Sequence, residues 1–209
     1  MKRVWRFTVL VICLVVWVVS GMTAAPQARK VVIDTDPGTD DALAILLALN
    51  SPELDVKALT VVAGNVVVEQ GVENALKLVS LAGRCDVLVA RGASHPLVQK
   101  LITAEFFQGA TGLGDVELPA PTCQADTSFA PDLIIKLIHQ YPHEITLVPV
   151  GPLTNIALAL RKDPSIVPLV KEVVLMEVQS PEAMRPQRRR PTSTMIRKQR
   201  AECSRPAGR

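Results

Sequence analysis

Short apolar runs rich in β-branched residues alternate along this chain with longer segments of helical periodicity. The first run lies at residues 30–34, and residues 39–49 space their apolar side chains as a buried helix does. The pattern then repeats, predicting further strands and helices in alternation. Such alternation forms a parallel sheet through right-handed crossovers, so we predict an α/β fold with helices on both faces. The further strands are predicted at 54–62, 86–90, 144–150 and 171–176, and the further helices at 68–82, 131–140 and 153–160.

In a Rossmann-like parallel sheet, ligands bind beyond the carboxyl ends of the strands. This rule selects residues 34–41, 63–65, 91–96 and 150–155, together with whatever follows Met176. We therefore expect a functional site to be built from these segments.

The charges are distributed unevenly. Residues 31–176 hold 9 basic and 17 acidic side chains, although the whole chain has a net charge of +3, because the surplus of Lys and Arg lies at the two ends. An acidic central domain does not attract nucleic acid, so no nucleic-acid partner is expected. A contact of the basic residues 177–209 with nucleic acid or acidic lipid is a weaker reading than a solvated, disordered tail.

Residues 1–28 have the order of a secretory signal. Lys2, Arg3 and Arg6 precede an apolar run at 7–19, in which Thr8 is the one polar residue, and small residues follow. We therefore expect an exported protein, periplasmic or extracellular. The apolar run is short for a membrane span, but an uncleaved anchor stays open as the one expected membrane contact.

The cysteines indicate neither a zinc site nor a disulfide-rich scaffold. Cys85, Cys123 and Cys203 form no C-x-x-C pair and lack the spacing of metal ligands. A bridge between Cys85 and Cys123 is permitted in an oxidising compartment, but nothing in the sequence requires it.

Four aspartates lie within eight residues after the first strand: Asp34, Asp36, Asp40 and Asp41. Acids in the first turn of a helix cap its free N–H groups, which accounts for Asp40 or Asp41 but not for all four. Crowded carboxylates raise one another's pKa and destabilise a fold unless a cation lies among them. We therefore predict a hard divalent ion, Ca²⁺ or Mg²⁺, on which Asp36 and Asp41 converge.

Such a site can activate water. A metal ion lowers the pKa of a bound water molecule, and a neighbouring carboxylate can accept the proton as the water attacks. Asp36 is the candidate for both roles, metal ligand and general base.

Five motifs, in order along the chain, resemble those of the inosine-uridine preferring nucleoside hydrolase family. The resemblance covers residues 30–176, about half of a usual family member, so we divide the chain into a signal or anchor at 1–28, a partial nucleoside hydrolase domain at 29–176 and a tail at 177–209. The motifs are the acidic signature at 31–42, Val-Ala-Gly-Asn at 62–65, the glycine-rich loop at 109–114, Val-Gly-Pro-Leu-Thr-Asn at 150–155 and the strand at 172–176.

The resemblance implies an N-glycosyl hydrolase that cleaves a ribonucleoside into base and ribose with bound Ca²⁺. It implies that Asp36 and Asp41 hold the calcium ion together with the backbone carbonyl of Val150, and that Asp36 is the base that activates the water. An acidic pocket suits this reaction, because positive charge develops on the sugar in an oxocarbenium-like transition state.

The resemblance also implies a sugar site. Asp40 and Asn65 would hold ribose hydroxyls or the water, Met176 would line the ribose pocket, and Asp34 would have a supporting role. Gln108 stands where many members have His before the glycine-rich loop, which leaves the base preference open.

Two alternatives stay open. Asp34-x-Asp36 after a strand resembles haloacid-dehalogenase-type phosphatases, with Asp34 as the nucleophile, but Gly38 stands where that pattern has Thr or Val. The other is an inactive, exported nucleoside-binding remnant. Release of free base separates the hydrolase from the phosphatase, and saturable binding without release of ribose would support the remnant.

From Glu177 the chain becomes basic, without aromatic residues or apolar periodicity. A shifted reading frame can be tested by forming each new codon from the last base of one codon and the first two bases of the next. In this frame Met176–Glu177 must give Gly and Met195–Ile196 must give Asp. With suitable synonymous codons at the other positions, the shifted frame reads as a sequence that resembles the family's next motif. We therefore predict a frameshift, genuine or a sequencing error, directly after Met176. The written chain would lack the family's remaining ribose and calcium ligands, so we expect impaired catalysis. A homo-oligomer stays open but is not favoured for this chain.

Overall fold

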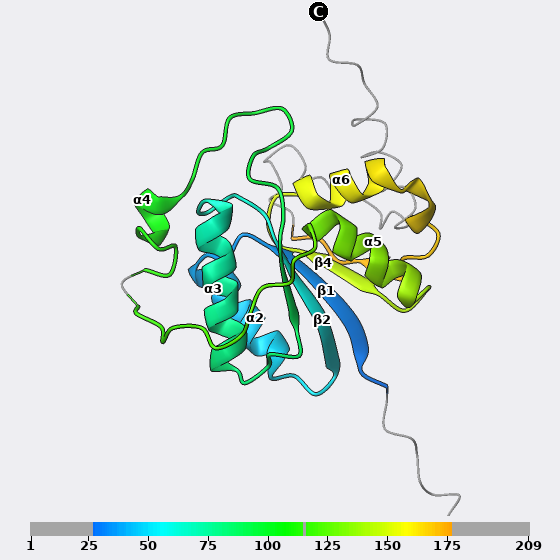
Figure 1. Cartoon of the computed structure of the whole chain (residues 1–209), viewed down its shortest axis with the longest axis horizontal. Coiled ribbons are helices and arrows are strands. Elements are labelled where there is room, and N and C mark those ends of the chain that lie inside the picture. Colours follow the sequence, from blue (N-terminus) through cyan, green and yellow to red (C-terminus); the bar gives the residue numbers. More distant parts are fainter. Residues whose placement is uncertain (1–26, 115, 177–209) are drawn as a thin grey trace, which may run out of the picture.

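Five parallel strands form one sheet in the computed structural model, which describes residues 27–114 and 116–176 (Figure 1). Their order is β3-β2-β1-β4-β5, and each neighbouring pair is parallel. The predicted α/β fold with a parallel sheet is confirmed. The strands are β1 (Arg29–Thr35), β2 (Leu54–Val61), β3 (Leu88–Arg91), β4 (Thr146–Pro149) and β5 (Glu172–Val173).

Helices cover both faces of the sheet, as predicted. Figure 1 shows α2 (Thr39–Leu49) and α3 (Val68–Leu81) on one face, and α5 (Ala130–Gln140) and α6 (Thr154–Lys162) on the other. Side chains alternate along β1 between the two cores: Val31 and Ile33 join the core on the side of α2 and α3, and Val32 joins the other. A central strand buried on both faces explains why 30–34 reads as a continuous apolar run.

The strand order changes direction at β1. The chain runs from β1 outward to β2 and β3, then returns to place β4 on the other side of β1 and β5 beyond it. Asp34 in β1 pairs with Thr60 in β2 and with Pro149 in β4, so the carboxyl ends of all three strands meet at one edge. A reversal of this kind opens a crevice at the strand ends, which is where α/β proteins bind ligands.

Two short helices lie where no element is predicted. They are α4 (Glu105–Gln108) and the 3₁₀ helix η1 (Pro164–Ile166). A single turn shows no periodicity, and α4 is fixed by a tertiary contact, because the N–H of Ala104 donates to the carbonyl oxygen of Asn65 at 2.9 Å. The strand predicted at 86–90 begins two residues later, at Leu88, since Val87 still belongs to a turn closed on Arg84.

The predicted signal or anchor and the predicted out-of-frame tail lie almost wholly outside the described residues. Among the helices of the described part, none is both long and apolar enough to cross a membrane.

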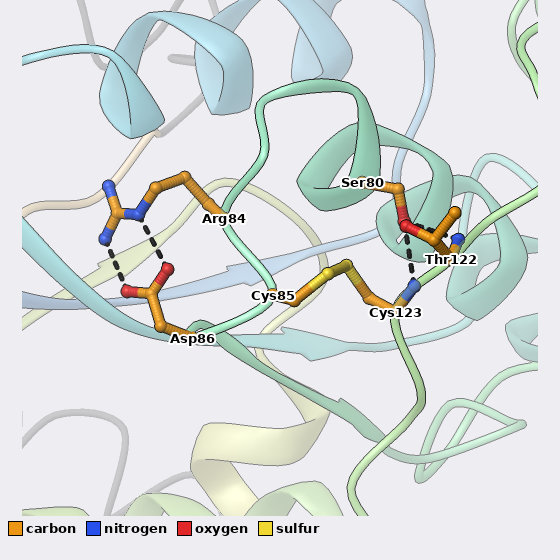
Figure 2. The surroundings of a disulfide bond; sticks show 6 residues. All are labelled: Ser80, Arg84, Cys85, Asp86, Thr122 and Cys123. Atoms are coloured by element: carbon orange, nitrogen blue, oxygen red, sulfur yellow. Dashed lines mark hydrogen bonds and ion pairs between the residues drawn. A yellow bond between two sulfur atoms is a disulfide. The ribbon is translucent and has the colours of Figure 1, made fainter.

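A disulfide joins Cys85 and Cys123, 38 residues apart (Figure 2). It ties the turn after α3 to the long connection between α4 and α5. The hydroxyl oxygen of Ser80 reinforces the tie, because it accepts hydrogen bonds from the N–H groups of Thr122 at 3.0 Å and Cys123 at 3.1 Å. The bridge that the sequence permits without requiring is therefore formed.

We expect the double variant Cys85→Ser, Cys123→Ser to be less stable than the wild type. Cross-linking a loop of this length removes entropy from the unfolded chain, which corresponds to about 2–4 kcal/mol. Urea unfolding of the oxidised and reduced wild type should show this difference, and the double variant should be insensitive to reductant. Equal unfolding free energies for oxidised and reduced protein would contradict the expectation.

Candidate functional site

The acidic turn, residues 34–41, joins the carboxyl end of β1 to the start of α2. Asp34 is still within the strand, Pro37 follows its end, and Gly38 is the N-cap of α2. The N–H of Gly38 donates to a carboxylate oxygen of Asp41 at 3.1 Å, which folds the turn back on itself. A side chain at position 38 would not fit, since a Cβ atom there would lie 2.7 Å from the amide nitrogen of Asn65.

Asp36 and Asp41 come together around Asn65, as the sequence predicts for the two carboxylates. The backbone N–H of Asn65 donates to Oδ2 of Asp36 at 2.8 Å, and its side-chain amide donates to Oδ2 of Asp41 at 3.2 Å. The hydroxyl of Thr35 donates to the other oxygen of Asp41 at 3.1 Å. Both acids are buried, with 8% of Asp36 and 6% of Asp41 exposed.

The pKa of Asp36 is raised to about 7, chiefly by burial and next by the negative charge of Asp41, while the hydrogen bond from the N–H of Asn65 acts in the opposite direction. Burial is also the main cause of the raised pKa of Asp41. The two carboxylates therefore disfavour each other's ionised form, and a cation between them would favour it.

Two glycines make room for the carboxylate of Asp36. A Cβ atom on Gly64 would lie 2.0 Å from its Oδ2 atom, and a Cβ atom on Gly151 would lie 2.5 Å from its Oδ1 atom. Both distances are below any real contact, so the backbone segments after β2 and β4 pack directly against the carboxylate. The requirement for glycine at both positions follows from this close approach.

Asp34, the first residue of the acidic turn, is buried, with only 1% of its surface exposed. Its Oδ1 atom accepts hydrogen bonds from Thr60 at 2.6 Å and Asn155 at 2.8 Å, while Oδ2 has no partner in the described part of the chain. Burial raises the pKa of Asp34 to about 7, against the effect of these two hydrogen bonds. Its carbonyl oxygen accepts the N–H groups of Val150 at 2.8 Å and Gly151 at 3.2 Å. Asp34 thus supports the site, and its burial does not suit the nucleophile of a phosphatase.

Asn74 and Asn155 hold the site together, although the sequence interpretation assigned neither a role. Asn155 fills the space above Gly92, where a Cβ atom would lie 2.3 Å from its side-chain oxygen. Asn74 is fully buried and donates to the carbonyl oxygens of Pro37 at 3.2 Å and Thr111 at 2.7 Å, which joins the glycine-rich loop to the acidic turn. The sequence does contain a sign of this role, because Asn74 is a polar residue on the apolar face of the helix predicted at 68–82.

The other predicted site residues lie around this centre. Asp40 is exposed, and the amide of Gln108 approaches its carboxylate at 3.4 Å. Met176 follows β5, where its N–H donates to the carbonyl of Pro149 at 3.3 Å, next to Val150. The side chain of Met176 is 61% exposed, so the described residues do not enclose it as a pocket wall would.

Neutral amides, rather than cations, surround the acidic turn. None of the eight ion pairs in the described part of the chain includes any of the four aspartates. Their hydrogen bonds come instead from side-chain amides, hydroxyls and backbone N–H groups, which leave the negative charge uncompensated. The amides that donate to the turn are those of Asn65, Asn74, Gln108 and Asn155.

The oxygen donors, the close glycines and the uncompensated charge fit a hard divalent cation. The described part of the chain groups no three His, Cys, Asp or Glu side chains for a metal ion; it offers the pair Asp36 and Asp41. Because Ca²⁺ takes roughly six to eight oxygen ligands, this pair and one backbone carbonyl would need water or further groups to complete a site.

Comparisons with known proteins agree with the motifs. A model of the family described as inosine-uridine preferring nucleoside hydrolase matches residues 31–177. The chain is 44% identical over 149 residues to uridine nucleosidase 1 of Arabidopsis thaliana, covering 71% of this chain and 44% of that protein. It is 46% identical over 150 residues to an inosine-uridine preferring nucleoside hydrolase of Crithidia fasciculata, covering 71% of this chain and 48% of that protein.

A solved structure of a purine-preferring ribonucleoside hydrolase from Gardnerella vaginalis superposes with a TM-score of 0.68 at 41% identity, over 71% of this chain and 48% of that one. The chain thus spans about half the length of the curated relatives it matches. These matches do not favour the phosphatase alternative. The fold, the motifs at the strand ends and the family match over most of its length show that this chain belongs to the inosine-uridine preferring nucleoside hydrolase family.

Proposed function

We propose that this protein hydrolyses the N-glycosidic bond of ribonucleosides, releasing base and ribose. The observation that carries the proposal is the pair of buried carboxylates, Asp36 and Asp41, held by Asn65 at the strand ends and paired with no cation among the described residues. The names of the relatives cover uridine, inosine and purine nucleosides, so the shared substrate class is the ribonucleoside rather than one base.

We assign Asp36, Asp41 and the backbone carbonyl of Val150 as ligands of a resident Ca²⁺ ion. The ion, when bound, supplies positive charge that lowers the pKa of a water ligand. Asp34 supports this set by accepting the N–H groups of Val150 and Gly151, which fixes the loop after β4 against β1.

Asp36 accepts the proton of the attacking water in this proposal. Its carboxylate cannot turn freely, because Asn65 holds Oδ2 and the backbones at Gly64 and Gly151 pack against both oxygens. A fixed base of this kind contributes through orientation as well as proton transfer. The negative charge of the acidic turn also stabilises the positive charge that develops on the sugar.

Asp40 and Asn65 bind the ribose hydroxyls in this proposal, and Met176 covers the sugar from the side of β5. Asp40 is suited because it is exposed and directly precedes the buried Asp41. The frame change predicted after Met176 would remove the family's remaining ligands, so we propose that the written chain is less active than a frame-corrected one.

We also propose that the protein is exported. The apolar run at 7–19 supports this assignment, and so does the bridge between Cys85 and Cys123, since disulfides persist in oxidising compartments.

Replacing Asp36 with Asn is expected to reduce turnover by about 10²–10⁴-fold, because the variant cannot accept the proton of the water. Release of ribose from inosine and uridine by the frame-corrected protein measures the effect, with the written chain assayed alongside. Asp132→Asn is the matched control, because Asp132 lies on α5, paired with Lys162 and away from the acidic turn. Full activity of Asp36→Asn would refute the proposed base.

Calcium is expected to raise the melting temperature of the wild type, because a ligand that binds only the folded state stabilises it by about 2.7 kcal/mol at 100 times its Kd. Asp41→Asn should lose most of this shift, since it removes one of the two buried ligands, whereas Asp132→Asn should keep it. Differential scanning fluorimetry with calcium and with chelator gives the comparison. An equal calcium shift in Asp41→Asn would place the ion elsewhere.

A further inference from the structure

Gln108, the last residue of α4, reaches the acidic turn with both atoms of its amide. Its side-chain oxygen accepts the N–H of Thr39, the first residue of α2, at 3.1 Å. Its side-chain nitrogen donates to a carboxylate oxygen of Asp40 at 3.4 Å. The two contacts determine the orientation of the Gln108 amide. With its oxygen and nitrogen exchanged, the NH₂ group would face the N–H of Thr39 and the oxygen would face the carboxylate of Asp40.

The backbone around Gln108 is anchored to the same site. The carbonyl oxygen of Gln108 accepts the N–H of Gly114 at 2.7 Å, which closes the glycine-rich loop. At the other end of α4, the N–H of Ala104 donates to the carbonyl oxygen of Asn65 at 2.9 Å. The helix α4 therefore bridges Asn65 and Asp40, the two residues proposed to hold the ribose.

The chemistry of glutamine suits this place. Asp40 is exposed, and none of the ion pairs in the described part of the chain restrains its carboxylate. An amide can accept from a helix N–H and donate to a carboxylate at once, without adding a charge that would compensate the acidic turn. A methionine of similar length could make neither hydrogen bond, and a glutamate would face Asp40 with a like charge.

We propose that Gln108 is a positioning residue that holds the Asp40 carboxylate in the orientation in which it accepts a hydrogen bond from a ribose hydroxyl. It also links this orientation to the glycine-rich loop, which closes on its carbonyl oxygen. The inference deepens the proposed function and rests on it, because ribose binding by Asp40 belongs to that proposal.

Ribose is the probe for the test, since it carries the hydroxyls and is not cleaved. The full chain, labelled with ¹⁵N, is titrated with ribose in the presence of calcium and followed by NMR. Gln108→Met should raise the Kd for ribose about three- to tenfold, the net effect of one ordinary hydrogen bond, and Gln108→Glu should raise it more. Exchange of the Thr39 amide with solvent should become faster in Gln108→Met but not in Gln108→Glu, which keeps the acceptor oxygen.

Two further variants separate positioning from a structural role. Gln140→Met is the matched control, because within the described residues the Gln140 amide donates only to its neighbour Tyr141, at 3.1 Å. The Kd of this variant should stay within about twofold of the wild type. In an Asp40→Asn background, Gln108→Met should have no further effect on the Kd, since there is no carboxylate left to orient.

An unchanged Kd in Gln108→Met, or an effect that persists in the Asp40→Asn background, would overturn the inference and leave the proposed function in place. A wild-type chain that binds no ribose would instead overturn the proposed sugar site of this chain, and the role of Gln108 in it. The two failures are therefore distinguishable.

Discussion

The charge repulsion between two buried carboxylates governs how this site is built. Asp36 and Asp41 both accept hydrogen bonds from Asn65, and no Lys, Arg or His is paired with them in the described part of the chain. A buried charge without a counterion loses its hydration, which destabilises the folded state by roughly several kcal/mol per ion. Rigid surroundings are needed to hold such a pair in place, and a cation from solution would lower its cost.

The fold supplies the rigid surroundings through the order of its strands. β1 lies between β2 and β4, so glycines that follow those two strands can press on the Asp36 carboxylate from both sides. Asp34, in β1, is bonded to both neighbouring strands. Its side chain accepts a hydrogen bond from Thr60 in β2, and its backbone carbonyl oxygen accepts one from the N–H of Val150, directly after β4. The reversal of strand order thus does more than open a crevice, because it determines which backbone segments confine the acids.

The sequence predicted what depends on local pattern and missed what depends on contacts between distant segments. The helix Thr39–Leu49 agrees with its prediction at both ends, because its apolar period and its acidic first turn are local signals. The helix Glu105–Gln108 has no period to detect, and its position depends on a hydrogen bond to Asn65. The role of Asn74 likewise arises from carbonyl groups at positions 37 and 111, which no spacing along the chain brings together. The pair Asp36 and Asp41 was predictable because four acids in eight residues need a common explanation.

The choice of amides over cations around the acidic turn has a functional reason. A lysine or arginine placed beside Asp36 would relieve the repulsion, but it would also occupy the carboxylate and oppose the positive charge that would develop on the sugar in the proposed hydrolysis. Amides such as Asn65 and Asn155 orient the acids through hydrogen bonds and add no net charge. The negative potential of the turn therefore stays available to the metal ion and the oxocarbenium-like sugar of the proposed reaction. The cost of burying these acids and their proposed role in catalysis have one cause, the negative charge that no cation in the described part of the chain neutralises.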